Sequence, residues 1–211
     1  MSRPDPPCGP AELQEHFGQI DIYLFDQLLR GRITPQMRVL DAGCGSGRNS
    51  HYLMRCGGRV FGIDSDPNEI SRIRAVAARL APALPATNFV VGRLDELPFD
   101  DGYFAAVVCS AVLHFAEDES EFQRMVSELW RVLGGGGVLF ARLASTIGIE
   151  DRVHQLHGRT HRLPDGSDRF LVDEESLLRL TSDLGGELLD PLKTTNVQNL
   201  RAMTTWVVSK A

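Results

Sequence analysis

The sequence predicts an α/β fold built around a mostly parallel sheet, and three observations support this fold class. From residue 38 onward, short apolar runs alternate with longer segments of helical periodicity, which is typical of repeated βα units. The glycine-rich stretch "GCGSG" at 43–47 directly follows the first apolar run, where a parallel sheet turns from strand to helix. The last two predicted strands are joined by only a few residues, so they must be antiparallel.

Seven strands follow from the apolar runs, at residues 38–43, 59–65, 87–93, 103–110, 136–143, 187–197 and 202–210. Helical patterns cover residues 11–31, as one helix or two short ones, and 47–56, 68–81, 120–133 and 174–185. Asp66 and Asp118 precede two of these helices, with a glutamate three residues later in each case, which is the spacing of a capping box. Residues 95–103 are too short for a helix, so that crossover is predicted to be abbreviated.

Three further features complete the predicted organisation. The four glycines at 134–137 are interpreted as a helix stop and turn, and Trp130 and Trp206 are expected in the core. Residues 144–172 show no clear period, and we interpret so long a stretch as a lid. The chain is therefore divided into a leader and helical cap over 1–37, with a flexible leader at its start, and one domain over 38–211.

Composition limits the class of protein. The 211 residues are enough for one sizeable core. The net charge of −6 disfavours nucleic acid as the main partner, because proteins that bind phosphate backbones usually carry a basic surplus. The four cysteines form no CxxC pair, so neither a metal site nor a disulfide framework is predicted. The sequence shows no secretion signal and no apolar run near the roughly 18 residues of a membrane span, so we expect a cytoplasmic protein outside the membrane.

The glycine loop and one carboxylate predict a ligand that contains a nucleoside. Gly43 and Gly45 let the chain turn sharply and bring backbone amides against a ligand, while Gly47 lets the next helix pack close to the strand. Asp64 ends the second strand about twenty residues later, where a carboxylate can accept hydrogen bonds from both hydroxyls of a ribose. The glycines alternate, in contrast to the GxGxxG spacing of dinucleotide sites, so a nicotinamide-dependent oxidoreductase is disfavoured.

Four stretches carry a family resemblance: "VLDAGCGSGRNS" (39–50), "GIDSDPNEI" (62–70), "VVGRLDELPFDDGYFAAVVCSAVLHF" (90–115) and "ELWRVLGGGGVLF" (128–140). Together they resemble the successive motifs of class I S-adenosylmethionine-dependent methyltransferases (methyltransferase domain 11/25-like), with a weaker likeness to the tellurite-resistance branch. The resemblance covers residues 38–143. It implies a Rossmann-like, seven-stranded, mostly parallel sheet of order 3-2-1-4-5-7-6, with strand 7 antiparallel and helices on both faces.

The resemblance also implies S-adenosylmethionine as the cofactor and S-adenosylhomocysteine as its product. Gly43, Cys44 and Gly45 would line the methionine part through their backbone, and Asp41 would support that loop or the ammonium group. Asp64 would hold the ribose. The cofactor residues implied in all are Asp41, Gly43, Cys44, Gly45, Asp64, Ser65, Arg93, Leu94, Cys109 and Ser110.

The remaining implied contacts are at the adenine and at the sulfonium. Ser65 would lie against the adenine. Arg93 stands where many relatives have an acid that reaches the adenine amino group, so Leu94 through its backbone, or Asp95, is expected to take over this contact. Cys109 and Ser110 would pass beside the methionine and the sulfonium.

The acceptor side rests on fewer residues. His114 lies where the resemblance places acceptor-facing residues and is a candidate general base, with packing as the alternative. Tyr23 and His16 are candidates to cover the site, again with packing as the alternative. His157 in the lid is a candidate substrate contact, and a solvated, mobile lid is the alternative. Three lid histidines would share one face of a helix, but Gly158 weakens that helix, and no metal is predicted.

The predicted function is methyl transfer to a small-molecule acceptor, mainly by proximity and orientation, in a monomer or homodimer. No recognition domain or basic face for a macromolecular substrate is evident in the sequence. The alternative is a non-catalytic protein that binds S-adenosylmethionine or S-adenosylhomocysteine and regulates a partner.

Overall fold

The computed structural model describes residues 9–211, so Cys8 and nearly all of the expected leader lie outside the described residues. The helices are α1 Pro10–Phe17, α2 Ile22–Leu29, α3 His51–Arg55, α4 Pro67–Leu80, α5 Glu119–Val132 and α6 Glu174–Asp183, with 3-10 turns η1 Ala86–Asn88 and η2 Leu113–Phe115. The strands are β1 Arg38–Ala42, β2 Arg59–Asp64, β3 Phe89–Val91, β4 Phe104–Ser110, β5 Leu133–Ser145, β6 His154–His157, β7 Thr160–Arg162, β8 Asp168–Phe170, β9 Gly186–Leu188, β10 Lys193–Val197 and β11 Arg201–Lys210.

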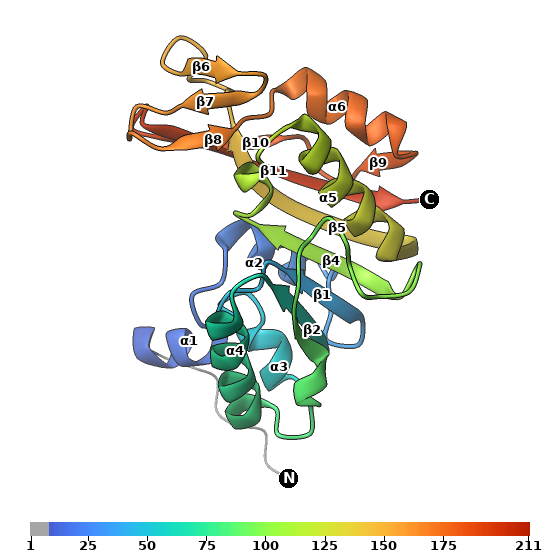
Figure 1. Ribbon diagram of the computed structural model, residues 1–211. Coiled ribbons are helices and arrows are strands. Elements are labelled where there is room, and N and C mark those ends of the chain that lie inside the picture. Colours follow the sequence, from blue (N-terminus) through green and yellow to red (C-terminus); the bar gives the residue numbers. More distant parts are fainter. Residues whose placement is uncertain (1–8) are drawn as a thin grey trace.

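The main sheet has the predicted strand order. It runs β3-β2-β1-β4-β5-β11-β10, with β1 to β5 parallel and β11 antiparallel to β5 (Figure 1). The expected fold class is thereby confirmed. One boundary was wrong: residues 187–197 form two strands, β9 and β10, which both pair with β11. Pro191 lies between them, and proline cannot donate a hydrogen bond to a neighbouring strand.

Helices cover both faces of the sheet and bury two apolar layers. Leu40 of β1 and Val107 of β4 pack in a core with α5 and α6, while Val39 and Val108 face the opposite core with α2, α3 and α4. Successive strand residues point to opposite faces, which explains this alternation. Trp130 and Trp206 lie in the first core, as predicted, and are 8% and 0% exposed.

The N-terminal helical pattern resolves into two short helices. Gly18 ends α1 with φ +67°, a left-handed conformation that favours glycine. Asp66 caps α4 and Asp118 caps α5, each accepting a backbone N–H as predicted, but the glutamates do not complete the capping boxes: Oε2 of Glu121 accepts the Glu117 N–H instead. The crossover between β3 and β4 has no helix, which confirms its abbreviation.

The glycine run at 134–137 was wrongly interpreted as a turn. It belongs to β5, which pairs with Phe104 of β4 at Leu133 and again from Val138 onward, with a shift of register between. The glycines therefore form a bulged start to the strand, and a bulge leaves residues unpaired where small side chains fit best.

Residues 144–172 contain a small antiparallel sheet, β6-β7-β8, which stands at one end of the molecule (Figure 1). Its base packs on a separate apolar cluster that includes Ile149, Leu163 and Leu171. The three lid histidines lie on strands, so the helical face considered for them does not form. Within residues 9–211, no group of three metal-ligating side chains comes together, and no helix is long and apolar enough to cross a membrane.

Candidate functional site

The glycine loop connects β1 to α3 at the carboxyl end of the sheet. The backbone φ angles of Gly43, Gly45 and Gly47 are +73°, +50° and +86°. A residue with a side chain would be strained in this left-handed conformation. A Cβ at Gly47 would lie 2.8 Å from Cγ1 of Ile73 on α4, which explains the close helix packing. A Cβ at Gly45 would lie 3.9 Å from its nearest neighbour, Oε2 of Glu69, so the middle of the loop is not tightly packed.

The tips of β1 and β2 are joined by hydrogen bonds. The Gly45 N–H donates to Oδ2 of Asp64 over 2.8 Å, and the N–H groups of Gly43 and Cys44 donate to the Ile63 carbonyl over 2.8 and 3.0 Å. Oδ1 of Asp64 accepts the Asp66 N–H over 3.0 Å. A carboxylate has about four lone-pair directions, so Asp64 keeps the capacity to accept two more donors.

Asp41 lies beneath this loop and is only 2% exposed. Burial raises the pKa of its carboxyl to about 7, although the hydrogen bond from Ser50 Oγ, 2.7 Å from Oδ2, and the nearby Arg48 act in the opposite direction. The carboxyl is therefore poised between its two protonation states near neutral pH.

The two cysteines of the predicted site contribute no reactive thiol. Cys44 is 5% exposed and Cys109 is 0% exposed, and burial raises the pKa of both thiols. The Cys109 side chain packs in the core on the α5 side, while Cys44 packs in the core on the other face. Only the backbone of either residue is available to a ligand at this end of the sheet.

A small cavity opens beside the predicted adenine contacts, with a volume of about 140 Å³. Ser65, Leu94 and Asp95 line it, together with Val112. Sites for small molecules usually measure roughly 300–1,000 Å³. Val112 also packs against Gly43, since a Cβ added to that glycine would overlap the Val112 methyl groups. Val112 therefore stands between the small cavity and the glycine loop.

Arg93 is held at the rim of this cavity. Its Nε donates to Oδ1 of Asp95 over 2.9 Å, and its guanidinium also pairs with Glu121. The hydrogen bond from Arg93 is the main cause that lowers the pKa of Asp95. Arg93 and Asp95 thus engage each other, and both line the small cavity together with Leu94.

A second group, here called the polar cluster, comprises Asp21, Tyr23, Arg48, Ser110 and Arg142. Oδ2 of Asp21 accepts from Ser110 Oγ and from Nη1 of Arg142, each over 3.2 Å, and Arg48 Nη2 donates to Ser110 Oγ over 3.3 Å. The Arg142 guanidinium lies over the Tyr23 ring, 5.5 Å from its centre. Within the described part of the chain, the buried Nε of Arg142 has no hydrogen-bond partner.

Sequence reasoning missed three members of the polar cluster: Asp21, Arg48 and Arg142. A signal was present for Arg142, because it interrupts the apolar run "VLFARL" of β5. The β4–β5 register sets Ser110 beside Arg142. Tyr23 is a predicted site residue that the structure brings to this cluster, and its hydroxyl lies 2.7 Å from Oγ1 of Thr195.

His114 is buried, with 6% of its surface exposed, and its Nδ1 accepts the Ala144 N–H over 3.2 Å. This bond assigns the proton of the neutral ring to Nε2. Burial lowers the pKa of His114 to about 4, and the nearby Arg169, Arg142 and Arg201 act in the same direction. The geometry therefore favours the packing alternative over a general base.

The other two histidines considered for the site lie apart from the polar cluster. His157 is exposed at the end of β6, in the outer strand of the small sheet (Figure 1). His16 packs against Phe17 and Tyr52, with ring centres 4.8 and 5.7 Å apart.

Comparisons with known proteins agree with this arrangement. The family described as "Methyltransferase domain" matches residues 40–141. An uncharacterized methyltransferase of Synechocystis is 33% identical over 106 residues, which are 50% of this chain and 46% of that protein. The chain spans less than half the length of the first curated relatives that it matches.

Two solved structures share the fold. A methyltransferase of Methanosarcina mazei, described as S-adenosylmethionine-dependent, superposes with a TM-score of 0.70 at 24% identity, covering 87% of this chain and 96% of that one. A magnesium protoporphyrin IX methyltransferase of Synechocystis, with S-adenosylhomocysteine bound, superposes with a TM-score of 0.67 at 17% identity, covering 98% and 90%.

Proposed function

We propose that this chain, whose residues 40–141 belong to the class I S-adenosylmethionine-dependent methyltransferase family, transfers a methyl group from that cofactor to a small-molecule acceptor. The observation that carries the proposal is the hydrogen bond between the Gly45 amide and Asp64, which brings the tips of β1 and β2 together. This is the position where an α/β sheet binds a nucleoside-containing ligand.

The residues at this end of the sheet fit the cofactor. The glycine loop is not tightly packed at Gly45, and Asp64 retains acceptor capacity for the two ribose hydroxyls. In the proposed complex, the backbone of Gly43, Cys44 and Gly45 lines the methionine part. Ser65 and the backbone of Leu94 border the adenine in the small cavity.

Asp41 supports the loop from below and offers a carboxylate to the ammonium group of the methionine part. A positive charge beside it would favour the ionised form of the carboxyl and so lower its raised pKa. Cofactor binding and deprotonation of Asp41 are therefore coupled in this proposal.

The bound cofactor supplies a methyl group on a sulfonium, and the protein contributes mainly orientation. Holding two reactants in contact and correctly oriented can lower the activation free energy by on the order of 7–11 kcal/mol, without any acid or base. The burial and hydrogen bond of His114 agree with a reaction that needs no general base. We therefore assign His114 a positioning role, because its hydrogen bond fixes η2 onto β5. The reaction then needs no proton acceptor from this histidine.

The polar cluster is the proposed acceptor site. Ser110, which the family motif sets beside the sulfonium, belongs to it, and Arg142 and Tyr23 offer polar groups to an incoming molecule. A small acceptor agrees with the similar Synechocystis enzyme, which is named for magnesium protoporphyrin IX. His157, at the exposed end of β6, stays a predicted contact for the distal part of the acceptor.

A thermal-shift measurement tests the cofactor assignment. S-adenosylhomocysteine at one hundred times its dissociation constant should stabilise the protein by about 2.7 kcal/mol, whereas NAD should not. Asp64→Ala should abolish the shift and leave the fold intact. Asp183→Ala, which removes an exposed carboxylate from the end of α6, should keep it. Absence of any shift with the wild-type protein would refute the proposal.

A transfer assay separates the enzyme from a non-catalytic binder. The protein is incubated with labelled S-adenosylmethionine and a library of small acceptors, and release of S-adenosylhomocysteine is measured. Methyl transfer to a library compound by the wild type, and its absence in Asp64→Ala, would support the assignment as an enzyme. A clear thermal shift without transfer to any compound overturns the catalytic part of the proposal in favour of the binder.

A further inference from the structure

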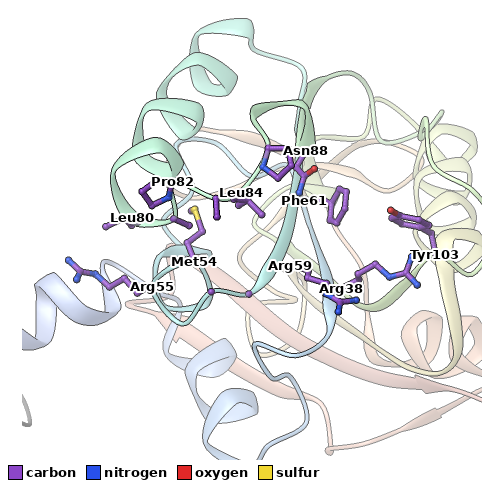
Figure 2. Close-up of a pocket in the computed structure, with 15 residues that line it drawn as sticks. Arg38, Met54, Arg55, Arg59, Phe61, Leu80, Pro82, Leu84, Asn88 and Tyr103 are labelled. Atoms are coloured by element: carbon purple, nitrogen blue, oxygen red, sulfur yellow. The ribbon is translucent and has the colours of Figure 1, made fainter. Parts of the chain in front are cut away.

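A larger cavity lies at the opposite end of the sheet from the glycine loop. It measures about 590 Å³, within the roughly 300–1,000 Å³ of small-molecule sites. The first residues of β1 and β2, Arg38 and Arg59, border it, and the segment that follows α4 forms another wall (Figure 2). We call it the amino-end cavity. It shares no lining residue with the small cavity near Ser65.

The two arginines at its edge are an unusual pair. Arg38 and Arg59 are directly opposite each other in the register of β1 and β2, and both are exposed. Like charges placed opposite each other on neighbouring strands destabilise a sheet. Among residues 9–211, neither guanidinium has a carboxylate partner, although the chain carries a net charge of −6. An anion bound between them would relieve this repulsion.

The geometry of the pair is suited to an anion. The Arg38 guanidinium lies over the Tyr103 ring, 4.3 Å from its centre, which holds its planar fork in place. Figure 2 shows Arg38 and Tyr103 side by side, with Arg59 next to them. Arg55 points away from this group and pairs with Glu15 over 3.1 Å. The positive end of the cavity is therefore made by Arg38 and Arg59.

The rest of the cavity is mainly apolar. Phe61, Leu80 and Leu84 line it, and none of the described residues around it is acidic. Phe61 packs edge-on against Tyr103, with ring centres 5.6 Å apart, and Asn88 is fixed by a 3.0 Å hydrogen bond to the Val60 carbonyl. An inorganic ion would leave these apolar walls in contact with water, so the walls call for a hydrocarbon or aromatic body.

We propose that the amino-end cavity binds a small organic acid with an apolar body. Its carboxylate lies between Arg38 and Arg59, where guanidinium groups can form paired hydrogen bonds, and its body lies against Phe61, Leu80 and Leu84. The site is separate from the proposed methyl-transfer site and does not depend on it.

Calorimetric titration with three probes tests the pairing of charge and apolar body. Octanoate carries both features, 1-octanol has only the body, and acetate has only the charge. Octanoate should bind the wild-type protein at least about tenfold more tightly than either of the others. Equal binding of 1-octanol would overturn the role of the arginines. Equal binding of acetate would reveal an adventitious ion only.

Substitutions then locate the site. Arg38→Gln with Arg59→Gln should weaken octanoate binding at least about tenfold, whereas Arg179→Gln, at an exposed arginine on α6, should leave it unchanged. Leu84→Gln should weaken octanoate while leaving acetate unaffected. Unchanged octanoate binding in the double variant would refute the proposal.

Two further measurements keep the result interpretable. The double variant removes a repulsion but also the stacking of Arg38 on Tyr103, and these are of similar size, so its urea midpoint should stay close to that of the wild type, which distinguishes lost binding from lost folding. The oligomeric state is measured by light scattering alongside. Three observations together would overturn the proposal in favour of contact between copies of this chain. They are a dimeric wild-type protein, no octanoate binding to that dimer, and a monomeric double variant.

Discussion

The carboxyl of Asp41 links stability to pH. Burial is the main cause that raises its pKa to about 7, from 3.8 for a free carboxyl. Because the folded pKa lies above the unfolded one, its stabilising contribution is complete below about pH 4 and is lost as pH rises through 7. As pH rises from about 4 to above 7, the free energy of unfolding of the wild type should therefore fall relative to that of Asp41→Asn, by up to a few kcal/mol. Urea unfolding at steps of pH measures this, and parallel curves for the two proteins would contradict it.

His114 acts with the opposite sign. Burial lowers its pKa to about 4 from 6.5, so its contribution is complete above about pH 6.5 and is lost as pH falls through 4. The advantage of the wild type over His114→Asn should shrink across that range. The two groups oppose each other over an overlapping interval, so only the single variants separate them. A constant difference between wild type and variant would show that His114 does not titrate as its burial requires.

Single residues were predictable where spacing along the chain determines their place. Asp64 was found because it ends a strand that neighbours the glycine loop, and parallel strands end at one edge of a sheet. Asp21 could not be found in this way. It meets Ser110 over 89 positions of sequence, and only the placement of α2 brings the two together. Arg142 likewise depends on the pairing of β4 with β5.

Among the elements, the glycine loop makes the sharpest demand on its residues. Gly43 and Gly31 share a left-handed backbone, with φ of +73° and +68°, but only Gly43 has a neighbour, Val112, where a Cβ would be. Gly31→Ala should cost about 1–3 kcal/mol from backbone strain alone. Gly43→Ala should cost clearly more, because the overlap with Val112 is added.

Urea unfolding of the two alanine variants measures the difference. Equal midpoints would mean that Val112 moves aside freely. The same pair also separates stability from binding, because only Gly43 lies in the loop proposed to meet the cofactor.

Element boundaries were predictable from apolar runs but not from exposed strands. β2 and β4 were found because each contains an unbroken apolar stretch, and β1 because Val39 and Leu40 lie directly before the glycine loop. All four residues of β6 are exposed, so no alternation marks the strand. The interruption at Pro191 and the bulge at the start of β5 are settled by pairing with neighbours, which local pattern does not contain.

At the scale of the whole molecule, a group of ion pairs joins the first helices to the last strands, and Asp190 is its least exposed member. Asp190 precedes β10 and is 9% exposed; its Oδ2 accepts from Arg32 Nη1 over 2.6 Å and from Gln27 Nε2 over 3.1 Å. Burial acts to raise the pKa of Asp190, but the hydrogen bonds from Gln27 and Arg32 outweigh it, so the pKa lies below its usual range.

Asp190→Asn should destabilise the protein by about 1–3 kcal/mol, because it leaves the Arg32 guanidinium without its charged partner. Asp101→Asn is the matched control: its side chain is 82% exposed in the pair with Arg131, so the loss should stay below about 1 kcal/mol. Urea unfolding at pH 7 gives both values. Because the folded pKa of Asp190 lies below the unfolded value of 3.8, the Asp190 effect should narrow as pH falls below 3.8, where the unfolded carboxyl is protonated first. Equal effects of both variants would show that this link is no stronger than a surface pair.

The turn after β4 has a consequence for the speed of binding. Ala111 adopts φ +65°, rare for a residue with a side chain, and its N–H donates to the Arg142 carbonyl over 2.7 Å, which pins Val112 onto Gly43. A molecule that approaches the glycine loop from this side is blocked by Val112 until the turn changes conformation. The observed rate constant of binding should therefore reach a plateau at high ligand concentration, and the plateau should equal the rate at which the turn at Ala111 opens.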